Sequence, residues 1–297
     1  LVFGSELKVL KPFPGFTGSI NRDAIAGLLR LNYIAHPHSI YEGIYKLPPA
    51  SLLSWQAGAP HAQPLLYWDM KAVAESAVDN PFTGSDGEAV EELEKLMMDA
   101  VKIRMISDVP LGAFLSGGVD SSAIVALMQA QSSKPVRTFT IGFNEKEYNE
   151  ALFAKEVAQH LGTDHTEMYV TPKDALDVIP NIPHMFDEPF SDYSQIPTYL
   201  VSKIAREHVT VSLSGDAGDE LFTGYERYFM GRKIWDRVQP LPAPVRRGLA
   251  AGMTALRPST INALVSPAKG LLPEKWRHVS IGDKVHKLAE VLRTEEP

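Results

Sequence analysis

The chain has 297 residues, of which 44% are hydrophobic and 22% charged, a balance typical of a globular protein with a sizeable core and about two domains. Twenty-nine Lys and Arg against 36 Asp and Glu give a net charge of −7, which excludes a basic surface for nucleic acid. Cysteine is absent, so these residues form no disulfide, thiolate metal site or cysteine nucleophile, and no apolar run of about 18 residues predicts a membrane span.

The first feature that the residue pattern predicts along the chain is a boundary between two domains. Residues 72–87 are small, polar and turn-forming, with Asp79-Asn80-Pro81 among them, and they predict a linker. Apolar residues then recur at helical spacing and predict an amphipathic helix; they are Val90, Leu93, Leu96, Met97, Ala100 and Val101.

A strand, a glycine turn and a helix start follow within twelve residues. The apolar run Leu111–Leu115 ends at Ser116-Gly117-Gly118, and a helical pattern begins after Asp120. Backbone N–H groups at such a turn and the helix dipole favour an anion, so the segment predicts a phosphate cradle. It has neither the lysine of a Walker loop nor the G-x-G-x-x-G of a dinucleotide fingerprint.

The next segments alternate between strand and helix. The pattern predicts strands near 136–143, 165–170 and 209–213, and helices at 149–161 and 194–208. Asn149 and Gly162 are suited to cap the first helix, and Thr171-Pro172 is a typical helix start. The order predicts an α/β fold with a doubly wound, mostly parallel sheet, followed from residue 238 by a helical tail that carries Arg246 and Arg247 on its surface.

Three carboxylates crowd the loop after the last predicted strand. Asp216, Asp219 and Glu220 follow Ser214-Gly215 at the carboxyl end of that strand, where ligands of open α/β sheets bind. Acids gathered in this way repel one another unless a cation lies between them. The loop therefore predicts a cation or cationic substrate. Nine histidines show no metal-ligand spacing, and we expect no histidine metal site.

Two of these segments resemble a known family. Ser116 to Ser122, S-G-G-V-D-S-S, resembles the pyrophosphatase loop of the N-type ATP-dependent ligases. Ser214 to Tyr225, S-G-D-A-G-D-E-L-F-T-G-Y, resembles the second signature of the asparagine synthetase family. Residues 136–143, 186–190 and 197–203 are also similar to the bacterial members. The resemblance implies a PP-loop ATP pyrophosphatase fold, of the adenine nucleotide alpha hydrolase-like type.

The N-terminal residues resemble the end of that family's Ntn-type α+β glutaminase domain. The similar segments are 1–8, the expected closing strands 45–49 and 51–55, and 67–69. The resemblance implies a glutaminase remnant at 1–70, a linker at 71–87 and a C-terminally incomplete synthetase domain at 88–297. We interpret the chain as an internal fragment that cannot itself hydrolyse glutamine; Lys269 and Lys275 come too soon to match a later family lysine.

The resemblance also implies roles for individual residues. The residues implied to bind ATP are Phe114, Ser116, Gly117, Gly118, Asp120, Ser121, Ser122, Ile141, Ser214 and Gly215. Asp120 and Asp219 would hold Mg²⁺, with Glu220 structural. Asp216 stands where many members carry a glutamate that handles the intermediate and ammonia, so the implied catalytic residues are Asp120, Asp216 and Asp219.

The implied reaction is an AMP-forming amide ligation. Aspartate, ATP and ammonia from glutamine would give asparagine, AMP and pyrophosphate through a β-aspartyl-AMP intermediate. Two alternatives stay open: a related amidotransferase acting on a sugar acid, peptide or β-lactam precursor, and a non-catalytic nucleotide-binding module. The expected partners are small molecules, neither nucleic acid nor membrane, with a homodimer left open and a cytoplasmic location as the default.

Overall fold

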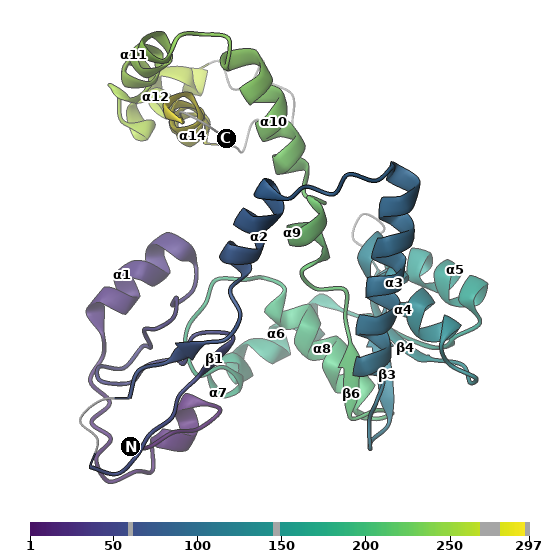
Figure 1. Cartoon of the computed structure of the whole chain (residues 1–297). Coiled ribbons are helices and arrows are strands. Elements are labelled where there is room, and N and C mark those ends of the chain that lie inside the picture. Colours follow the sequence, from purple (N-terminus) through teal and green to yellow (C-terminus); the bar gives the residue numbers. More distant parts are fainter. Residues whose placement is uncertain (59–61, 145–148, 268–279, 295–297) are drawn as a thin grey trace. The chain divides into compact units, whose positions relative to one another are not determined.

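A computed structural model describes residues 1–58, 62–144, 149–267 and 280–294 (Figure 1). Its strands are β1 (Ser51–Leu52), β2 (Leu65–Leu66), β3 (Leu111–Phe114), β4 (Arg137–Phe143), β5 (Asp164–Val170) and β6 (Val211–Leu213). Its helices up to the last strand are η1 (Leu7–Leu10), α1 (Arg22–Leu31), α2 (Met70–Asp79), α3 (Asp86–Arg104), α4 (Val119–Ala130), α5 (Ala151–Leu161), α6 (Pro172–Val178), η3 (Ile179–Asn181), α7 (Ile182–Met185) and α8 (Gln195–Arg206). After β6 come α9 (Gly218–Phe222), α10 (Glu226–Val238), α11 (Ala243–Thr254), α12 (Pro258–Val265) and α14 (Ile281–Arg293).

The chain divides into two compact units, Leu1–Gly215 and Asp216–Pro297. The first contains a four-stranded sheet in the order β5-β4-β3-β6, in which every neighbouring pair is parallel. The chain therefore moves outward from β3 through β4 to β5, and then crosses to the other side of β3 to form β6. The predicted α/β fold with a doubly wound parallel sheet is confirmed.

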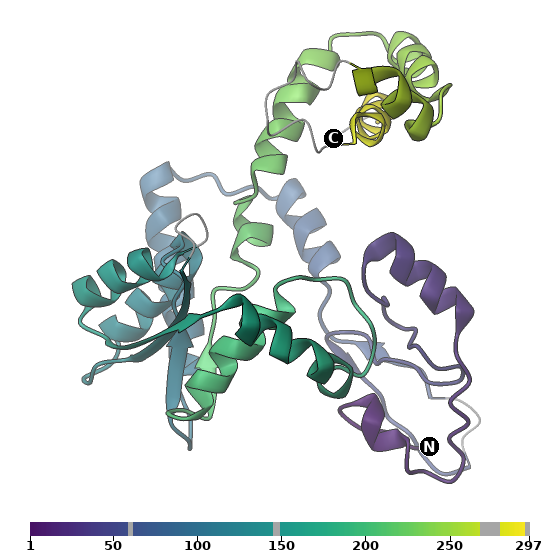
Figure 2. The same cartoon turned by 180° about the vertical axis from the view of Figure 1, so that it is seen from behind.

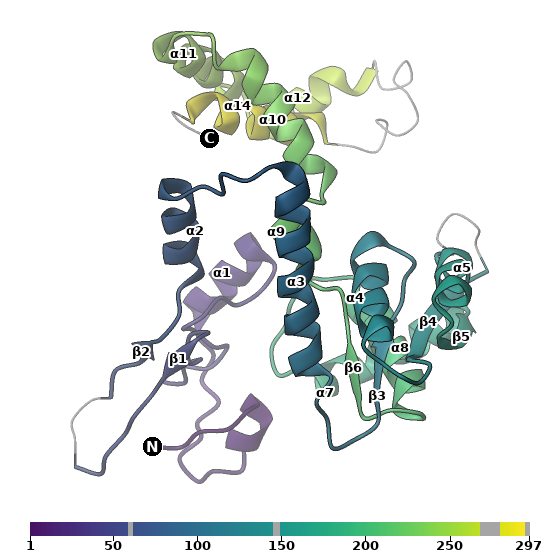
Figure 3. The same cartoon turned by 45° about the vertical axis from the view of Figure 1, so that its right-hand side comes forward.

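Helices cover both faces of this sheet. On one face α3, α4 and α5 pack against the strands, with Ala113, Leu115 and Val125 almost fully buried among them (Figure 3). On the other face α8 packs against β4 around Phe139, and Figure 2 shows this side from the front. Because successive strand residues point to opposite faces, neighbours such as Ala113 and Phe114 contribute to different cores.

Local chemistry explains where the helices of the alternating segment begin and end. The Asn149 side chain accepts a hydrogen bond from the first N–H of α5 at 3.2 Å, and Gly162 ends that helix with a φ of +70°. Thr171 and Asp174 form a capping box at the start of α6, with Pro172 in its first turn. The predicted end at Gly162 and the predicted start at Thr171-Pro172 are confirmed, whereas the N-cap residue of α5 is Glu150, one residue after the predicted Asn149.

The N-terminal part of the first unit has less regular structure than the sequence predicts. Of the two expected closing strands, only Ser51–Leu52 forms one, paired antiparallel with β2, while Tyr45 makes an isolated bridge to His38. Two prolines at 48–49 have no N–H to give to a ladder, and a two-stranded pair gains little on its own. Helix α2 occupies about the first half of the predicted linker, with the Asp69 side chain capping its start.

The second unit is helical, as predicted for the tail. Ala250 of α11 and Ala289 of α14 are fully buried against each other's helices. The expectation that Arg246 lies on the helix surface is wrong: it is 6% exposed, stacks over Trp235 at 5.0 Å and donates a hydrogen bond to the Thr294 carbonyl at 2.6 Å. Lys269 and Lys275 lie outside the described residues. No helix among the described residues is long and apolar enough to cross a membrane.

Candidate functional site

The two loops that the sequence singles out lie at the reversal point of the sheet. β3 has β4 on one side and β6 on the other, so the chain leaves β3 and β6 in diverging directions. In open α/β sheets the crevice at such a point, outside the carboxyl ends of the strands, is where ligands bind. The loop 115–118 follows β3, and Ser214 and Gly215 follow β6, so both segments border this crevice.

The loop after β3 is held in shape by its own hydroxyl groups. The Oγ atoms of Ser116 and Ser121 lie 2.9 Å apart, and Ser121 Oγ accepts a hydrogen bond from the Ser116 N–H at 3.2 Å. Ser116 Oγ in turn accepts from the Gly118 N–H at 3.2 Å. Gly117 has a φ of +80°, and a Cβ there would meet the Ala154 backbone nitrogen at 2.6 Å. The turn therefore needs glycine for its conformation and for its contact with α5.

Helix α4 begins at this loop without a side-chain cap. Gly118 is its N-cap residue, and no side chain within the described part of the chain bonds the first-turn N–H groups. The twelve-residue helix directs its dipole at this turn, so the turn attracts an anion. Asp120 lies in the same first turn and is half-buried. Carboxylate and open N–H groups side by side suit a phosphate that arrives with a cation.

The loop after β6 contacts this turn directly. A Cβ on Gly215 would lie 2.6 Å from the Ser121 nitrogen and 2.7 Å from the Asp120 carbonyl carbon. The backbone of the second motif therefore lies against the first turn of α4. Six of the implied ATP-binding residues come together here; they are Ser116, Gly117, Gly118, Asp120, Ser121 and Gly215.

Two buried hydroxyl groups on α4 and β6 have no hydrogen-bond partner among the residues that the structure describes. The Oγ atoms of Ser122 on α4 and Ser212 on β6 are buried, and neither meets a polar partner in the described residues. Buried polar groups are normally satisfied by protein, water or ligand. Ser212 was not predicted from the sequence, because within a strand of three residues nothing distinguishes it from a packing position.

Phe114 and Ile141, the two implied ATP-binding residues that lie in strands, can offer a nucleotide mainly their backbone groups. Their side chains pack into the core around Phe139, under α8. The last β3–β4 pair joins Phe114 to Phe139, and beyond it the Leu115 N–H bonds to the Phe139 carbonyl at 3.0 Å. Ile141 lies past this point, so its backbone on the β3 side borders the crevice.

A cavity next to Ser214 was also missed. It has a volume of about 190 Å³ and is lined by Met97, Ala100, Val101, Arg104, Ile124, Leu213 and Ser214. Four of these residues belong to one face of α3, whose spacing predicts only core packing. A core face and a cavity wall share the same apolar periodicity, so the sequence carries no signal that separates them.

The acids of the second motif belong to the second unit. Ala217 and Thr223, on either side of α9, have φ values of +73° and +57°. A Cβ on Gly224 would collide with the Asp219 carboxylate, so the glycine makes room for that side chain. The pairing of Asp120 with Asp219, and the roles of Asp216 and Asp219, stay predictions. No group of three or more His, Cys, Asp or Glu suited to a metal occurs among the residues that the structure describes.

Glu220 has a defined partner within the same unit. It accepts a hydrogen bond from the Tyr225 hydroxyl at 2.6 Å, which lowers the pKa of the Glu220 carboxyl. The same bond raises the pKa of Tyr225 to about 12. The Arg227 guanidinium stacks over the Tyr225 ring at 4.1 Å. These contacts tie the Glu220 side chain to the turn after α9.

Comparisons with known proteins agree with this geometry. The family model "Asparagine synthase" matches residues 92–296, and the model "Glutamine amidotransferase domain" matches residues 1–68. A Methanocaldococcus jannaschii protein named after glutamine-hydrolysing asparagine synthetase is 38% identical over 248 residues, which cover 82% of this chain and 46% of that protein. Asparagine synthetase 1 of Bacillus subtilis is 32% identical over 209 residues, 70% of this chain and 32% of the relative.

Other matches are shorter. Asparagine synthetase B of Escherichia coli is 31% identical over 175 residues, which cover 54% of this chain and 29% of that protein. Of the solved structures, NMN synthetase from Francisella tularensis has a TM-score of 0.31 at 15% identity, over 46% of this chain and 57% of that one, a similarity too low to assign a function. The chain spans less than half the length of each curated relative named above.

Proposed function

The chain belongs to the asparagine synthase family, and from this premise we propose that it carries the ATP site of an AMP-forming, glutamine-dependent asparagine synthetase. The proposed reaction joins aspartate and ammonia derived from glutamine, with ATP converted to AMP and pyrophosphate. The observation that carries the proposal is the contact of the two motif loops at the reversal point of the sheet, where the Gly215 backbone lies against Asp120 and Ser121.

The loop after β3 is proposed to hold the phosphates. The backbone N–H groups at Gly117 and Gly118 and the open first turn of α4 would bind the pyrophosphate part of ATP. The hydroxyls of Ser116, Ser121 and Ser122 would add hydrogen bonds, and the unpartnered Ser122 Oγ supports this role. The adenosine part would be bordered by backbone groups of Phe114, Ile141, Ser214 and Gly215.

Magnesium is proposed to bind through Asp120 and Asp219. The ion takes one or two carboxylates in such sites and completes its coordination with phosphate oxygens and water, so a donor set of two acids fits it when ATP is bound. When bound, the ion would neutralise the charge that develops on the leaving pyrophosphate. The loop contributes the amide donors that hold those same oxygens.

The chemistry divides into two displacements. In the first, a carboxylate oxygen of aspartate attacks the α-phosphorus of ATP, and the bond to pyrophosphate breaks. In the second, ammonia attacks the activated carbonyl carbon, AMP leaves, and the nitrogen loses a proton to form the amide. Asp216, next to the loop that contacts α4, is proposed to handle ammonia and the acyl adenylate.

The proposed domain organisation follows the matched segments. Residues 1–70 would be the end of a glutamine amidotransferase domain, 71–87 a connecting segment and 88–297 the synthetase domain. The two family matches, at 1–68 and 92–296, support a boundary in this region. Helix α2 lies within the connecting segment.

The test measures pyrophosphate release by the complete gene product that contains this sequence, with Mg-ATP and ammonium, with and without aspartate. We expect release that requires aspartate, with asparagine formed in equal amount. The Asp120→Asn variant should lose this release, whereas Asp99→Asn, on the exposed face of α3, should keep it. Release that is independent of aspartate would contradict the proposed substrate, and an active Asp120→Asn variant would contradict the metal assignment.

A further inference from the structure

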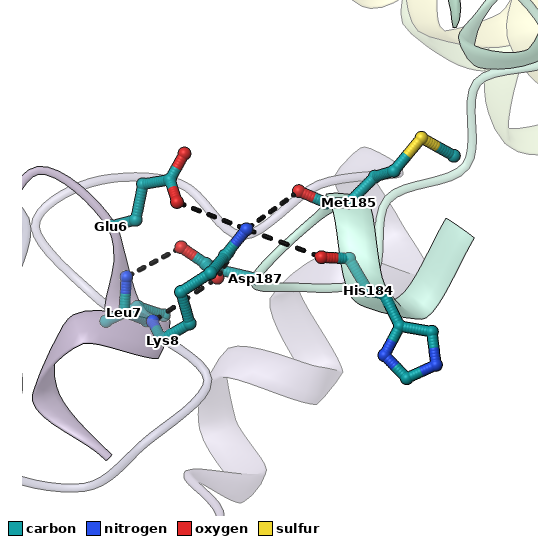
Figure 4. Close-up of polar contacts among 6 residues, drawn as sticks. All are labelled: Glu6, Leu7, Lys8, His184, Met185 and Asp187. Atoms are coloured by element: carbon teal, nitrogen blue, oxygen red, sulfur yellow. Dashed lines mark hydrogen bonds and ion pairs between the residues drawn. The ribbon is translucent and has the colours of Figure 1, made fainter. Parts of the chain in front are cut away.

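The loop between α7 and α8 contacts the N-terminal segment across nearly 180 residues of sequence. Asp187 Oδ2 accepts a hydrogen bond from the Leu7 N–H at 2.6 Å, and its Oδ1 accepts one from the Lys8 N–H at 3.3 Å (Figure 4). The Lys8 ammonium lies 3.6 Å from the same carboxylate and donates to the Met185 carbonyl at 3.1 Å. One carboxylate and one lysine therefore tie η1 to the end of α7.

The next residue makes a second contact of the same kind. Glu188 Oε1 accepts from the Ile40 N–H at 2.8 Å, and its Oε2 lies 2.5 Å from the Lys46 ammonium. Lys46 also donates to the Ile34 carbonyl at 2.7 Å. A backbone bond from the Ser191 N–H to the Asn32 carbonyl at 2.7 Å extends the contact along the loop.

Both carboxylates are largely removed from solvent. The exposed fractions of the Asp187 and Glu188 side chains are 16% and 14%, against 38% and 35% for Lys8 and Lys46. Charge-assisted bonds to backbone N–H groups are stronger than neutral ones, and a partly buried charge that loses its donors is costly. Each acid uses both oxygens, so an amide in its place would turn an NH2 group toward an N–H or an ammonium.

The position of this loop connects it to the candidate site. In a parallel α/β sheet each helix starts at the carboxyl edge of the strands and returns to the amino edge, where the next strand begins. Helix α8 precedes β6 in this way, so its first residue, Gln195, lies at the carboxyl edge. The loop 115–118 and the residues Ser214 and Gly215 leave the strands at that same edge. Asp187 and Glu188 lie in the segment that leads into this end of α8, so the N-terminal residues that they bond are tied to a loop that runs to the ligand side of the sheet.

We propose that Asp187 and Glu188 are positioning residues that couple the amidotransferase part to the synthetase part. By tying the N-terminal segment to this loop, they would let ammonia released from glutamine reach the acyl adenylate, while free ammonium would need no such contact. This inference rests on the proposed function, and it assigns a role to two acids that touch neither substrate nor metal in that proposal.

The test compares two nitrogen sources in the complete gene product. In the double variant Asp187→Asn with Glu188→Gln, the ratio of glutamine-driven to ammonium-driven amide formation should fall about tenfold, a size typical of coupling between sites. The ammonium-driven rate and its KM for ATP should stay at the wild-type values. Asp192→Asn is the matched control: it removes one charge from the same loop, where Asp192 bonds only locally to the Ser194 N–H at 2.8 Å.

A second measurement follows the contact itself. Backbone amide hydrogen exchange at Leu7 and Ile40 should become faster in the double variant, with exchange in β3 and β4 unchanged to show that the sheet stays folded. Lys46→Met removes the Lys46 contacts with Glu188 and the Ile34 carbonyl but keeps the backbone N–H bonds to both acids, so it should weaken the coupling less than the double variant. Faster exchange with an unchanged ratio would overturn the coupling role, and unchanged exchange would overturn the contact. If the wild-type protein showed no ammonium-driven amide formation, the proposed function and the coupling role would both be contradicted. The hydrogen-exchange comparison would still test the contact between the acids and the N-terminal segment.

Discussion

Two glycines set how closely the loops of the candidate site approach. Gly117 adopts a left-handed φ of +80° against α5, and Gly215 places its backbone against the first turn of α4. In both cases the nearest atoms include backbone atoms, which cannot move aside as a flexible side chain can. The motif strings S-G-G and S-G-D contain these glycines, but only the structure shows that each one meets a different helix.

Replacing Gly215 by Ala should therefore damage the site. The added Cβ would lie 2.6 Å from the Ser121 nitrogen, an overlap that costs about 1–3 kcal/mol when a packed region must shift. We expect the dissociation constant for Mg-ATP, measured by titration calorimetry, to rise about tenfold or more. Gly87→Ala is the control, since nothing lies within 4 Å of that position. Equal affinities in the two variants would contradict the role of the loop contact.

His165 is a half-buried titratable residue outside the candidate site. Its Nδ1 lies 2.8 Å from Thr138 Oγ1, and its Nε2 is buried without a partner in the described residues. Burial lowers the pKa of His165 below its ordinary 6.5, and the Lys155 ammonium lowers it further, while Glu167 acts in the opposite direction. The folded protein therefore protonates this imidazole less readily than the unfolded chain does.

This pKa shift has a consequence for stability at acid pH. Below about pH 6.5 the unfolded chain takes up a proton at His165 before the folded chain does, so the free energy of unfolding should fall as the pH drops through this range. Urea unfolding between about pH 7.5 and about pH 5.5, roughly one unit either side of the ordinary pKa, should show a weaker fall in stability for His165→Asn than for the wild-type protein. A slope that is the same in the wild-type protein and in His165→Asn would refute this assignment.

At the scale of elements, helix ends are the best-predicted features. Asn149, Gly162 and Thr171-Pro172 act through bonds to residues one to four positions away, so a single sequence contains all the required information. The strands around them were predicted for a similar reason, because buried parallel strands are short apolar runs between turns.

Two glycines in open space should show opposite effects on alanine substitution. Gly162 ends α5 with a φ of +70°, where a Cβ costs about 1 kcal/mol, whereas Gly27 lies inside α1, where alanine is favoured by up to about 1 kcal/mol. Neither position has an atom within 4 Å of the added Cβ. We expect the free energy of unfolding by urea to fall in Gly162→Ala and to rise in Gly27→Ala. The same sign in both variants would contradict the backbone argument.

Other elements depend on partners that are distant in sequence. The two-residue strand β1 exists because Leu65 and Leu66 lie opposite it, and no local pattern announces that pairing. Arg246 is buried because its guanidinium stacks over the Trp235 ring and donates a hydrogen bond to the Thr294 carbonyl. Without such partners, a pair of arginines on a helix predicts a solvated surface. The sequence contains these partners but not their proximity.

At the scale of the whole molecule, the sequence predicts only those features of the candidate site that lie within one continuous loop. Residues 116–122 are continuous, and the structure confirms that they form a turn at the start of a helix. The contact of Gly215 with this turn requires β6 to pair with β3, a step that the order of elements permits but does not determine. Ser212 and the cavity beside α3 depend on the same pairing and were missed.

The central claim is that ATP binds where the loops after β3 and β6 meet. Hydrogen exchange of the protein with and without Mg-ATP tests it most directly, because backbone N–H groups are the proposed donors. We predict slower exchange on ATP addition in residues 115–122 and 213–217, with little change in α11 and α14 of the second unit. ATP binding that leaves both loops unprotected, or no ATP binding at all, would contradict the account.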